Sequence, residues 1–185
     1  MHALVKVERG NFIESIHFGH AVVSDDSGQI VKAWGNPEEI ILPRSSIKMI
    51  QALPLILSGA ADAYGLSSKE LALSCASHQG AAEHTSAVSS WLENLGLRDV
   101  NLRCGPQVPD DPLAYQALIK KNRTPCQWHN NCSGKHSGFL TLTKHLGAGP
   151  EYIELDHPAQ KAALEMFEMT TRATSPGYGV DGCSA

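Results

Sequence analysis

Four short clusters of polar residues combine a hydroxyl or thiol with a base or with a residue that turns the backbone sharply. They are Arg44-Ser45-Ser46-Ile47-Lys48, Ser74-Cys75-Ala76-Ser77-His78, Asn130-Asn131-Cys132-Ser133-Gly134-Lys135-His136 and Asp181-Gly182-Cys183-Ser184-Ala185. A hydroxyl or thiol beside a base suits nucleophilic catalysis, and thiolates and imidazoles also bind metals. We therefore expect the functional residues to lie in these clusters.

Ser45 and Lys48 form an S-x-x-K pattern at the start of a predicted helix. A three-residue helical spacing puts both side chains on one face, where the lysine could take the seryl proton. Burial among apolar neighbours would favour the neutral amine that this step requires. About one such pattern arises by chance in a chain of this length, so the pattern alone leaves an incidental origin open.

Ser77 and His78 lie in a short polar segment that follows another predicted helix. Catalytic serine and histidine residues usually come from distant positions in the chain, so an adjacent pair is a weak signal. This cluster therefore predicts either a second active-site hydroxyl or a polar loop at the end of a helix.

The segment from Asn130 to His136 precedes a predicted helix, and it could hold an anion at the start of that helix. It is not a phosphate loop, because His129 stands where that motif requires glycine and His136 follows the lysine. Zinc binding by Cys132, His129 and His136, with Cys183 joining through the fold, stays open.

The composition favours a small soluble substrate. Of the 185 residues, 42% are hydrophobic and 18% charged, and the net charge is -4 without any run of like charges. Neither nucleic acid nor a membrane is an expected partner. The start of the chain lacks the apolar stretch of a signal peptide, which predicts a cytoplasmic protein. Five cysteines, an odd number, favour reduced thiols over a disulfide framework.

The elements that must position these clusters change in type along the chain. The first 35 residues predict an antiparallel meander of about three strands, with a hairpin turn at Asp25-Asp26-Ser27-Gly28. Helices follow, the first at 47–57, apolar nearly all round and kinked by Pro54. We expect an α+β fold, an antiparallel sheet with packed helices, as a single domain over residues 1–185.

Local sequence patterns predict where four later helices begin or end. A capping box joins Ser67 and Glu70, and Gly96 ends a helix that carries Val88, Trp91, Leu92 and Leu95. Asp111 and Asp156 are predicted to cap the next two, the latter with an apolar face that includes Phe167.

Taken in order, the four clusters resemble the rhizobial type of L-asparaginase, the asparaginase II family. The similarity runs from Val5 to the last residue. It implies hydrolysis of L-asparagine to L-aspartate and ammonia, on a fold similar to serine β-lactamases and glutaminases. It also implies site residues: Ser45, Lys48 and Ser77 as catalytic groups, Arg44 as a substrate-carboxylate contact with His136 and Asp181 close by, and Cys132, Lys135 and Cys183 as zinc ligands.

The resemblance further implies that the chain is the N-terminal portion of a longer protein. The lysine that partners Ser77 and the C-terminal strands of the sheet are then expected beyond residue 185, and the full-length form is expected to be a homodimer. An uncovered core predicts poor stability of the 185-residue chain.

Two alternative functions stay open at this stage. The same serine chemistry could act on glutamine or another small amide, because one methylene changes binding by only about 1–3 kcal/mol. The chain could instead be a catalytically silent fragment that at most binds zinc through Cys132 and Cys183.

Overall fold

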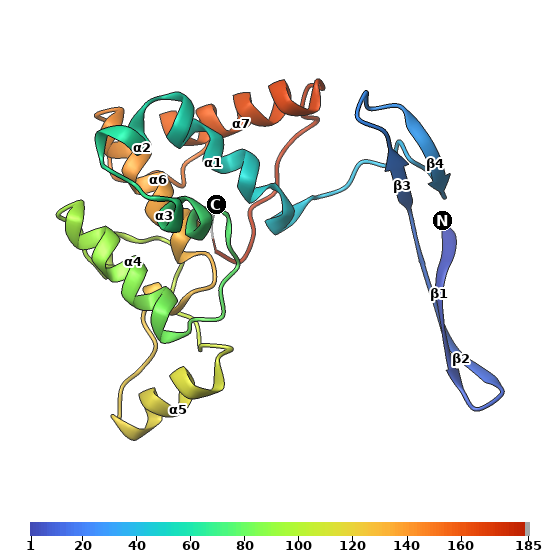
Figure 1. The fold of residues 1–185 in the computed structure, drawn as a ribbon, viewed down its shortest axis with the longest axis horizontal. Coiled ribbons are helices and arrows are strands. Elements are labelled where there is room, and N and C mark those ends of the chain that lie inside the picture. The colour runs from blue at the N-terminus through green and yellow to red at the C-terminus, as the bar shows by residue number, and fades with distance from the viewer. Residues whose placement is uncertain (184–185) are drawn as a thin grey trace. The chain divides into compact units, whose positions relative to one another are not determined.

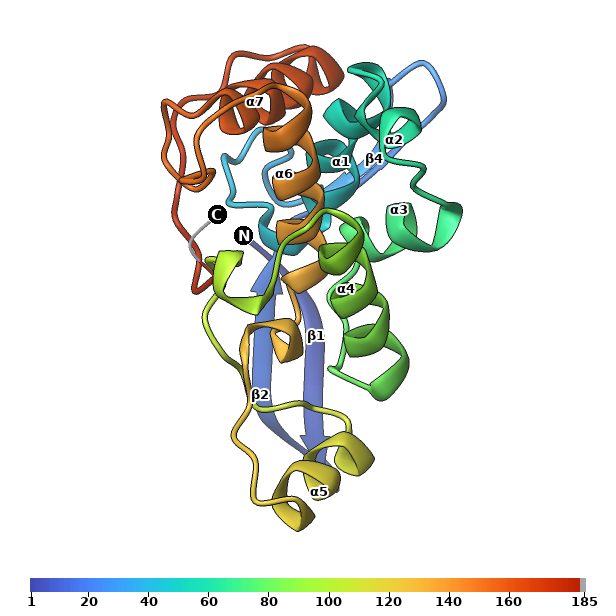
Figure 2. The same cartoon turned by 90° about the vertical axis from the view of Figure 1, so that its left-hand side faces the viewer.

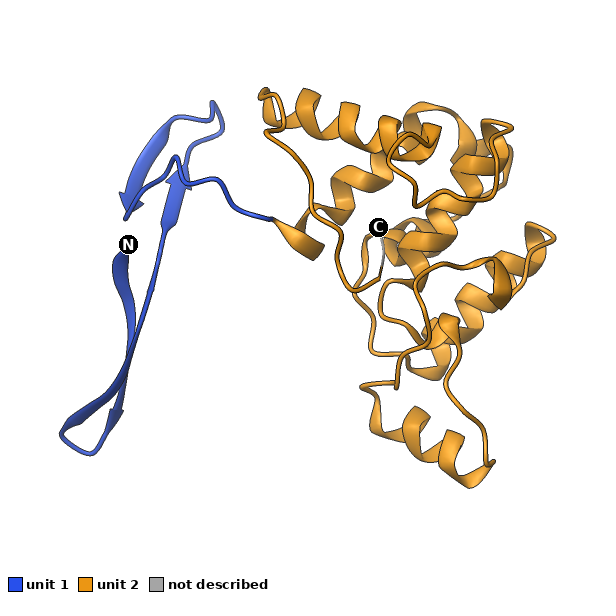
Figure 3. Ribbon diagram, turned by 180° about the vertical axis from the view of Figure 1, so that it is seen from behind, with its two compact units in different colours: residues 1–42 blue, residues 43–185 orange. Residues whose placement is uncertain are grey.

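The computed structural model describes residues 1–183. Ser184 and Ala185, the end of the fourth cluster, lie outside the described residues. Contacts divide the chain into two compact units, residues 1–42 and residues 43–185 (Figure 3). The single domain expected over the whole chain stays a prediction.

The first unit consists of two antiparallel hairpins (Figure 1). Strand β1 (His2–Arg9) pairs with β2 (Phe12–Gly19), and β3 (Ala21–Ser24) pairs with β4 (Ile30–Trp34). The expected three-strand meander is therefore wrong for the described residues, which form two separate two-stranded sheets. Strand β2 does not pair with β3, although only His20 separates them in the sequence.

The predicted turn between β3 and β4 is confirmed. The Asp25 carboxylate accepts hydrogen bonds from the backbone of Ser27 and Gln29, both at 2.9 Å. Gly28 takes the positive φ that the turn needs, at 86°. These contacts lower the pKa of Asp25, with the Ser27 hydroxyl as the largest cause.

The second unit is helical. Its elements are η1 (Arg44–Ile47), α1 (Lys48–Leu57), α2 (Ala60–Ala63), α3 (Ser68–Cys75), α4 (Ala82–Asn94), η2 (Asp99–Asn101), α5 (Pro112–Lys120), η3 (Gln127–His129), α6 (Ser133–His145) and α7 (Pro158–Thr171). The α+β class is thus observed, whereas the likeness to β-lactamases stays a prediction. No helix among the described residues is long and apolar enough to cross a membrane.

Helix α6 lies at the centre of this unit, in contact with α1, α2, α3, α4 and α7 (Figure 2). All of its residues from Ser133 to Thr143 are buried. The core around it is built largely from Trp91, Leu92, Leu102, Leu142 and Tyr152, each at most 2% exposed. The third cluster is therefore part of the core rather than a surface loop.

Gly134 permits the close crossing of α3 and α6. A Cβ at this position would lie 2.7 Å from Leu73 Cγ and would also meet the Leu73 carbonyl oxygen. Backbone atoms cannot yield as a flexible side chain can, so only glycine fits here without a shift of the helices. This crossing brings the segment before α6 next to the end of α3.

Most predicted helix ends are confirmed. The Ser67–Glu70 capping box is present, the Asp111 side chain accepts from Ala114 N at 2.7 Å, and Gly96 follows α4 with a φ of 69°. The predicted cap at Asp156 is wrong. His157 takes that position and accepts from Ala159 N at 3.1 Å, because Pro158 rather than the histidine occupies the first helical position.

Helix α1 is less buried than its sequence predicts. Lys48, Ala52, Pro54 and Leu55 are buried, but Met49, Ile56 and Leu57 are each more than half exposed. The expectation of a helix buried on most sides is wrong for this chain. The helix packs most extensively on α7 and also contacts α2, α3 and α6, and Lys48 is the only strongly polar residue among its buried ones.

Candidate active site

The buried Lys48 ammonium joins the first two clusters. It is 2% exposed, and it donates to Ser77 Oγ at 2.8 Å and to the Ala76 carbonyl at 2.7 Å. Both acceptors follow α3, where Ala76 turns the chain into an extended conformation with a ψ of 154°. The two hydrogen bonds compensate the cost of removing this charge from water. Ser77 as a residue is exposed, in contrast to its buried partner Lys48.

Ser45 and Arg44 lie in η1, just before Lys48, and both are exposed. Arg44 adopts a left-handed backbone conformation with a φ of 52°. Ser45 contributes its carbonyl, which accepts from Lys48 N. Among the described residues, no hydrogen bond connects either side chain to Lys48. The side-chain contact expected between Ser45 and Lys48 is therefore made by Ser77 instead.

This contact also changes an expectation about Ser77. The resemblance placed its lysine partner beyond residue 185, yet Lys48 is a lysine partner within the chain. The two residues are far apart in sequence, and the packing of α1 on α3 brings them together.

His78 fixes the segment that carries Ser77. Its Nδ1 accepts from Gly80 N at 3.1 Å, so in the neutral ring the proton is on Nε2, which donates to Ser133 Oγ at 2.7 Å. Its backbone N–H donates to Asn131 O at 3.1 Å. Burial, followed by the charge of His84, lowers the pKa of His78 to about 4. His78 is therefore a neutral anchor between the second and third clusters.

The third and fourth clusters meet at two thiols. The side-chain interaction with Cys183 and the positive charges of Lys48 and Lys135 lower the pKa of Cys132 to about 6, against its burial. Lys135 Nζ lies 3.3 Å from Cys183 Sγ, and the Cys183 thiol donates to Asp181 Oδ1 at 2.9 Å. The structure thus brings Cys132, Lys135, Asp181 and Cys183 together, as the resemblance implies.

His136 lies behind these thiols and is completely buried. Its Nδ1 is 2.8 Å from the Tyr152 hydroxyl, which accepts from Arg103 N at 2.7 Å. Burial lowers the pKa of His136, whereas Cys183 raises it. Its Nε2 has no hydrogen bond of good geometry among the described residues, although the Cys183 side chain is close enough to raise the pKa of the ring. A buried ring nitrogen of this kind is available to a ligand or metal near the thiols.

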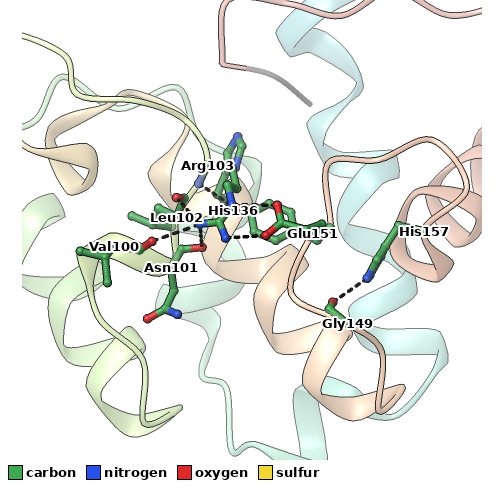
Figure 4. A network of polar contacts seen from close by, with 9 residues as sticks. Val100, Asn101, Leu102, Arg103, His136, Gly149, Glu151 and His157 are labelled. Atoms are coloured by element: carbon green, nitrogen blue, oxygen red, sulfur yellow. Dashed lines mark hydrogen bonds and ion pairs between the residues drawn. The ribbon is translucent and has the colours of Figure 1, made fainter.

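Arg103 secures the loop that carries Tyr152 (Figure 4). Its guanidinium binds both carboxylate oxygens of Glu151, at 2.8 and 3.0 Å, and also the carbonyls of Val100, Asn101 and Leu102. A bidentate pair of this type sets orientation as well as strength. Sequence reasoning missed Arg103 and Tyr152, because no local motif marks either residue.

The donors near the thiols suit zinc in type. Two sulfurs and the Lys135 nitrogen converge, and Lys135 would have to bind as the neutral amine. No group of three or more His, Cys, Asp or Glu residues within the described part of the chain is arranged to hold a metal. A set that includes a lysine is not such a group, so the two observations are compatible.

Comparison with known protein families shows to which family the chain belongs. A family model described as L-asparaginase II matches residues 5–185. The chain belongs to the L-asparaginase II family. This membership implies a hydrolase of the L-asparaginase type. No curated protein matches the chain in a sequence comparison.

The family match extends over all four clusters and over both compact units. For a member of the L-asparaginase II family, a buried lysine hydrogen-bonded to an exposed serine is a candidate base and hydroxyl. The Cys132 thiol, just before α6, is close enough to Lys48 for the positive charge of that lysine to lower its pKa.

Proposed function

We propose that this chain hydrolyses L-asparagine to L-aspartate and ammonia through a serine nucleophile, with Lys48 as the general base. Family membership supports the reaction. The single structural observation that supports the mechanism is the 2.8 Å contact between Lys48 Nζ and Ser77 Oγ. A buried lysine next to a serine is an arrangement that can transfer the seryl proton.

The proton transfer needs the neutral amine of Lys48. In that state Nζ keeps an N–H bond to the Ala76 carbonyl and has a lone pair that can accept from Ser77 O–H. The hydroxyl oxygen of the nucleophilic serine, deprotonated by Lys48 directly or through Ser77, then attacks the side-chain amide carbon of asparagine. The lysine proton leaves with ammonia, and water hydrolyses the resulting acyl-enzyme to release aspartate.

Two serines are candidates for the attacking group. The resemblance supports Ser45, which is exposed in the turn before Lys48, and the direct hydrogen bond supports Ser77. We propose Ser45 as the nucleophile with Ser77 assisting its proton transfer, and the reversed roles as the alternative. In both cases Lys48 is the base.

Acyl-enzyme trapping distinguishes the two serines. Acid quenching during turnover of L-asparagine, followed by peptide mapping, should reveal an aspartyl ester on the peptide that contains the nucleophile. Ser45→Ala should remove the ester if Ser45 attacks, and Ser77→Ala should only slow its formation. An ester on Ser77 would reverse the roles, and no ester on either would overturn the proposal.

Substrate recognition is proposed for Arg44, His136 and Asp181. A guanidinium binds a carboxylate through two parallel hydrogen bonds, which suits the α-carboxylate of a small amino acid. Asp181 and His136 both interact with the Cys183 side chain, which places them near each other.

We also propose that Cys132, Lys135 and Cys183 bind a zinc ion. Zinc would supply Lewis-acid polarisation or structural cross-linking at this pocket. The lowered pKa of Cys132 supports this proposal, since the thiolate is the form that binds metal. The full-length protein is proposed to act as a homodimer.

Glutamine is the main competing substrate. Rates of ammonia release from L-asparagine and L-glutamine, measured at equal concentrations, decide between asparaginase and glutaminase activity. We expect asparagine to be preferred, and a preference for glutamine would correct the substrate assignment.

A further inference from the structure

A second cavity, of about 410 Å³, lies between α4, η2 and η3 within residues 43–185. Its lining includes none of the residues assigned above to catalysis, substrate binding or zinc. Cavities of about 300–1,000 Å³ commonly hold small organic ligands. The size therefore suits a small molecule such as a single amino acid.

One wall of this cavity is apolar. Leu92 and Leu97 form it with Val100 and the half-buried indole of Trp128. Val100 is 66% exposed, so part of its apolar surface is open to water. Covering such a wall with an aliphatic or aromatic group is favourable in proportion to the apolar area removed from water.

Opposite charges flank the apolar wall. Glu93 and Arg98 both line the cavity and are exposed, and Arg98 forms no side-chain hydrogen bond or ion pair with any described residue. Asp99 adds a carboxylate whose orientation is fixed, because its Oδ1 accepts from Trp128 N at 2.9 Å. An ammonium can pair with the carboxylates, and a carboxylate with the guanidinium.

We propose that this cavity binds an α-amino acid with an aliphatic or aromatic side chain. The side chain would lie on Trp128 and its apolar neighbours, the ammonium near Glu93 and Asp99, and the carboxylate on Arg98. A zwitterion with an apolar side chain matches the cavity in volume, charge and hydrophobicity. Asparagine has a polar side chain and does not match the apolar wall.

The ligand would also contact Trp128, which is connected by hydrogen bonds to the segment that carries Ser77. The Trp128 carbonyl accepts from Ser133 Oγ at 3.0 Å, and Ser133 Oγ is the partner of His78, the anchor of the Ser77 segment. Binding that orders η3 should therefore raise the stability of the protein. This inference does not depend on the proposed asparagine hydrolysis.

Calorimetric titration of the 185-residue chain tests the proposal with L-phenylalanine and two analogues that each lack one charge, 2-phenylethylamine and 3-phenylpropanoate. We expect saturable binding of phenylalanine and at least about tenfold weaker binding of both analogues. L-asparagine should not compete. Equal affinity of the two analogues and phenylalanine, or no saturable binding at millimolar concentration, would overturn it.

Two variants assign the binding to this cavity. Arg98→Gln should lower the affinity for phenylalanine about tenfold and leave that for 2-phenylethylamine unchanged. Arg123→Gln, which removes an exposed arginine that does not line the cavity, should change neither. If Arg98→Gln bound phenylalanine as tightly as the unmodified chain, the assignment of the carboxylate to Arg98 would be wrong.

Discussion

Lys48 Nζ lies 2.8 Å from Ser77 Oγ, and the lysine is buried while the serine is exposed. The contact crosses from the first residue of α1 to the loop after α3. It gives one lysine access to a hydroxyl that a substrate can reach. The hydrogen bond to Ala76 O fixes the amine against the backbone, so the position of the base depends on how α1 packs on α3.

The first prediction concerns that packing. Gly134→Ala places a methyl group against the Leu73 carbonyl, so that α3 and α6 must move apart. We expect the free energy of unfolding to fall by about 1–3 kcal/mol. Urea denaturation measures the change. Gly149→Ala is a matched control, since a Cβ there meets no atom within 4 Å. Equal stability of the two variants would show that the close crossing is not required.

The second prediction concerns His78 and pH. Its folded pKa of about 4 lies below the ordinary 6.5, so its contribution to stability is complete above pH 6.5 and is lost as the pH falls toward 4. The linked loss is on the order of 3 kcal/mol. His78→Gln keeps an amide N–H for Ser133 but cannot titrate, so its unfolding free energy should fall less between pH 7 and about pH 4.

Urea unfolding at several pH values measures this difference. His2→Gln, a change at an exposed strand residue, should retain the pH dependence of the unmodified chain. If His78→Gln and the unmodified chain lost stability in parallel, His78 would not be the titrating anchor.

The third prediction concerns zinc. The purified chain should bind about one zinc ion, and Cys132→Ser or Cys183→Ser should weaken binding at least tenfold, because each removes a proposed thiolate ligand. Competition with a chromophoric chelator measures the affinity. Cys75→Ser, at a half-buried thiol outside the pocket, serves as control. Full zinc affinity in the double variant at Cys132 and Cys183 would refute the proposed ligand set.

The fourth prediction concerns the two hairpins of residues 1–42. Their strands are exposed throughout apart from three half-buried residues, and isolated two-stranded hairpins are marginally stable in water. Amide hydrogens in β1 to β4 should therefore exchange much faster than those of the buried helix α6. Hydrogen exchange with mass spectrometry measures both segments in one experiment. Protection of the strands equal to that of α6 would contradict the expectation.

Local signals predicted the helix ends well. The caps at Ser67 and Asp111 depend on side chains that bind backbone atoms two or three residues away, so the sequence contains the whole interaction. For the last helix, α7, the same reasoning predicted Asp156 as the cap, one residue before the observed cap His157, because histidine is rarely considered as a capping residue. The predicted strand pairing was wrong because the apolar runs indicate strands but not their partners, and the four strands form two separate hairpins.

Contacts across the fold could not be predicted from spacing. The S-x-x-K pattern indicated that Lys48 would contact Ser45 within one helical turn. The long lysine side chain instead reaches Ser77, in the loop after α3. Tyr152 reaches His136 from the loop before α7, and nothing in its neighbourhood signals that role. Spacing left Cys132 and Cys183 as one zinc possibility that also included His129 and His136, and only the resemblance selected the two thiols together with Lys135.

The central claim is hydrolysis of L-asparagine with Lys48 as the base, and steady-state ammonia release tests it most directly. The unmodified chain should release ammonia, and Lys48→Met should lower the rate by about 10²–10⁴-fold because the proton acceptor is lost. Lys161→Met, at an exposed lysine on α7, should retain the full rate. No ammonia from the unmodified chain, or an undiminished rate in Lys48→Met, would contradict the account.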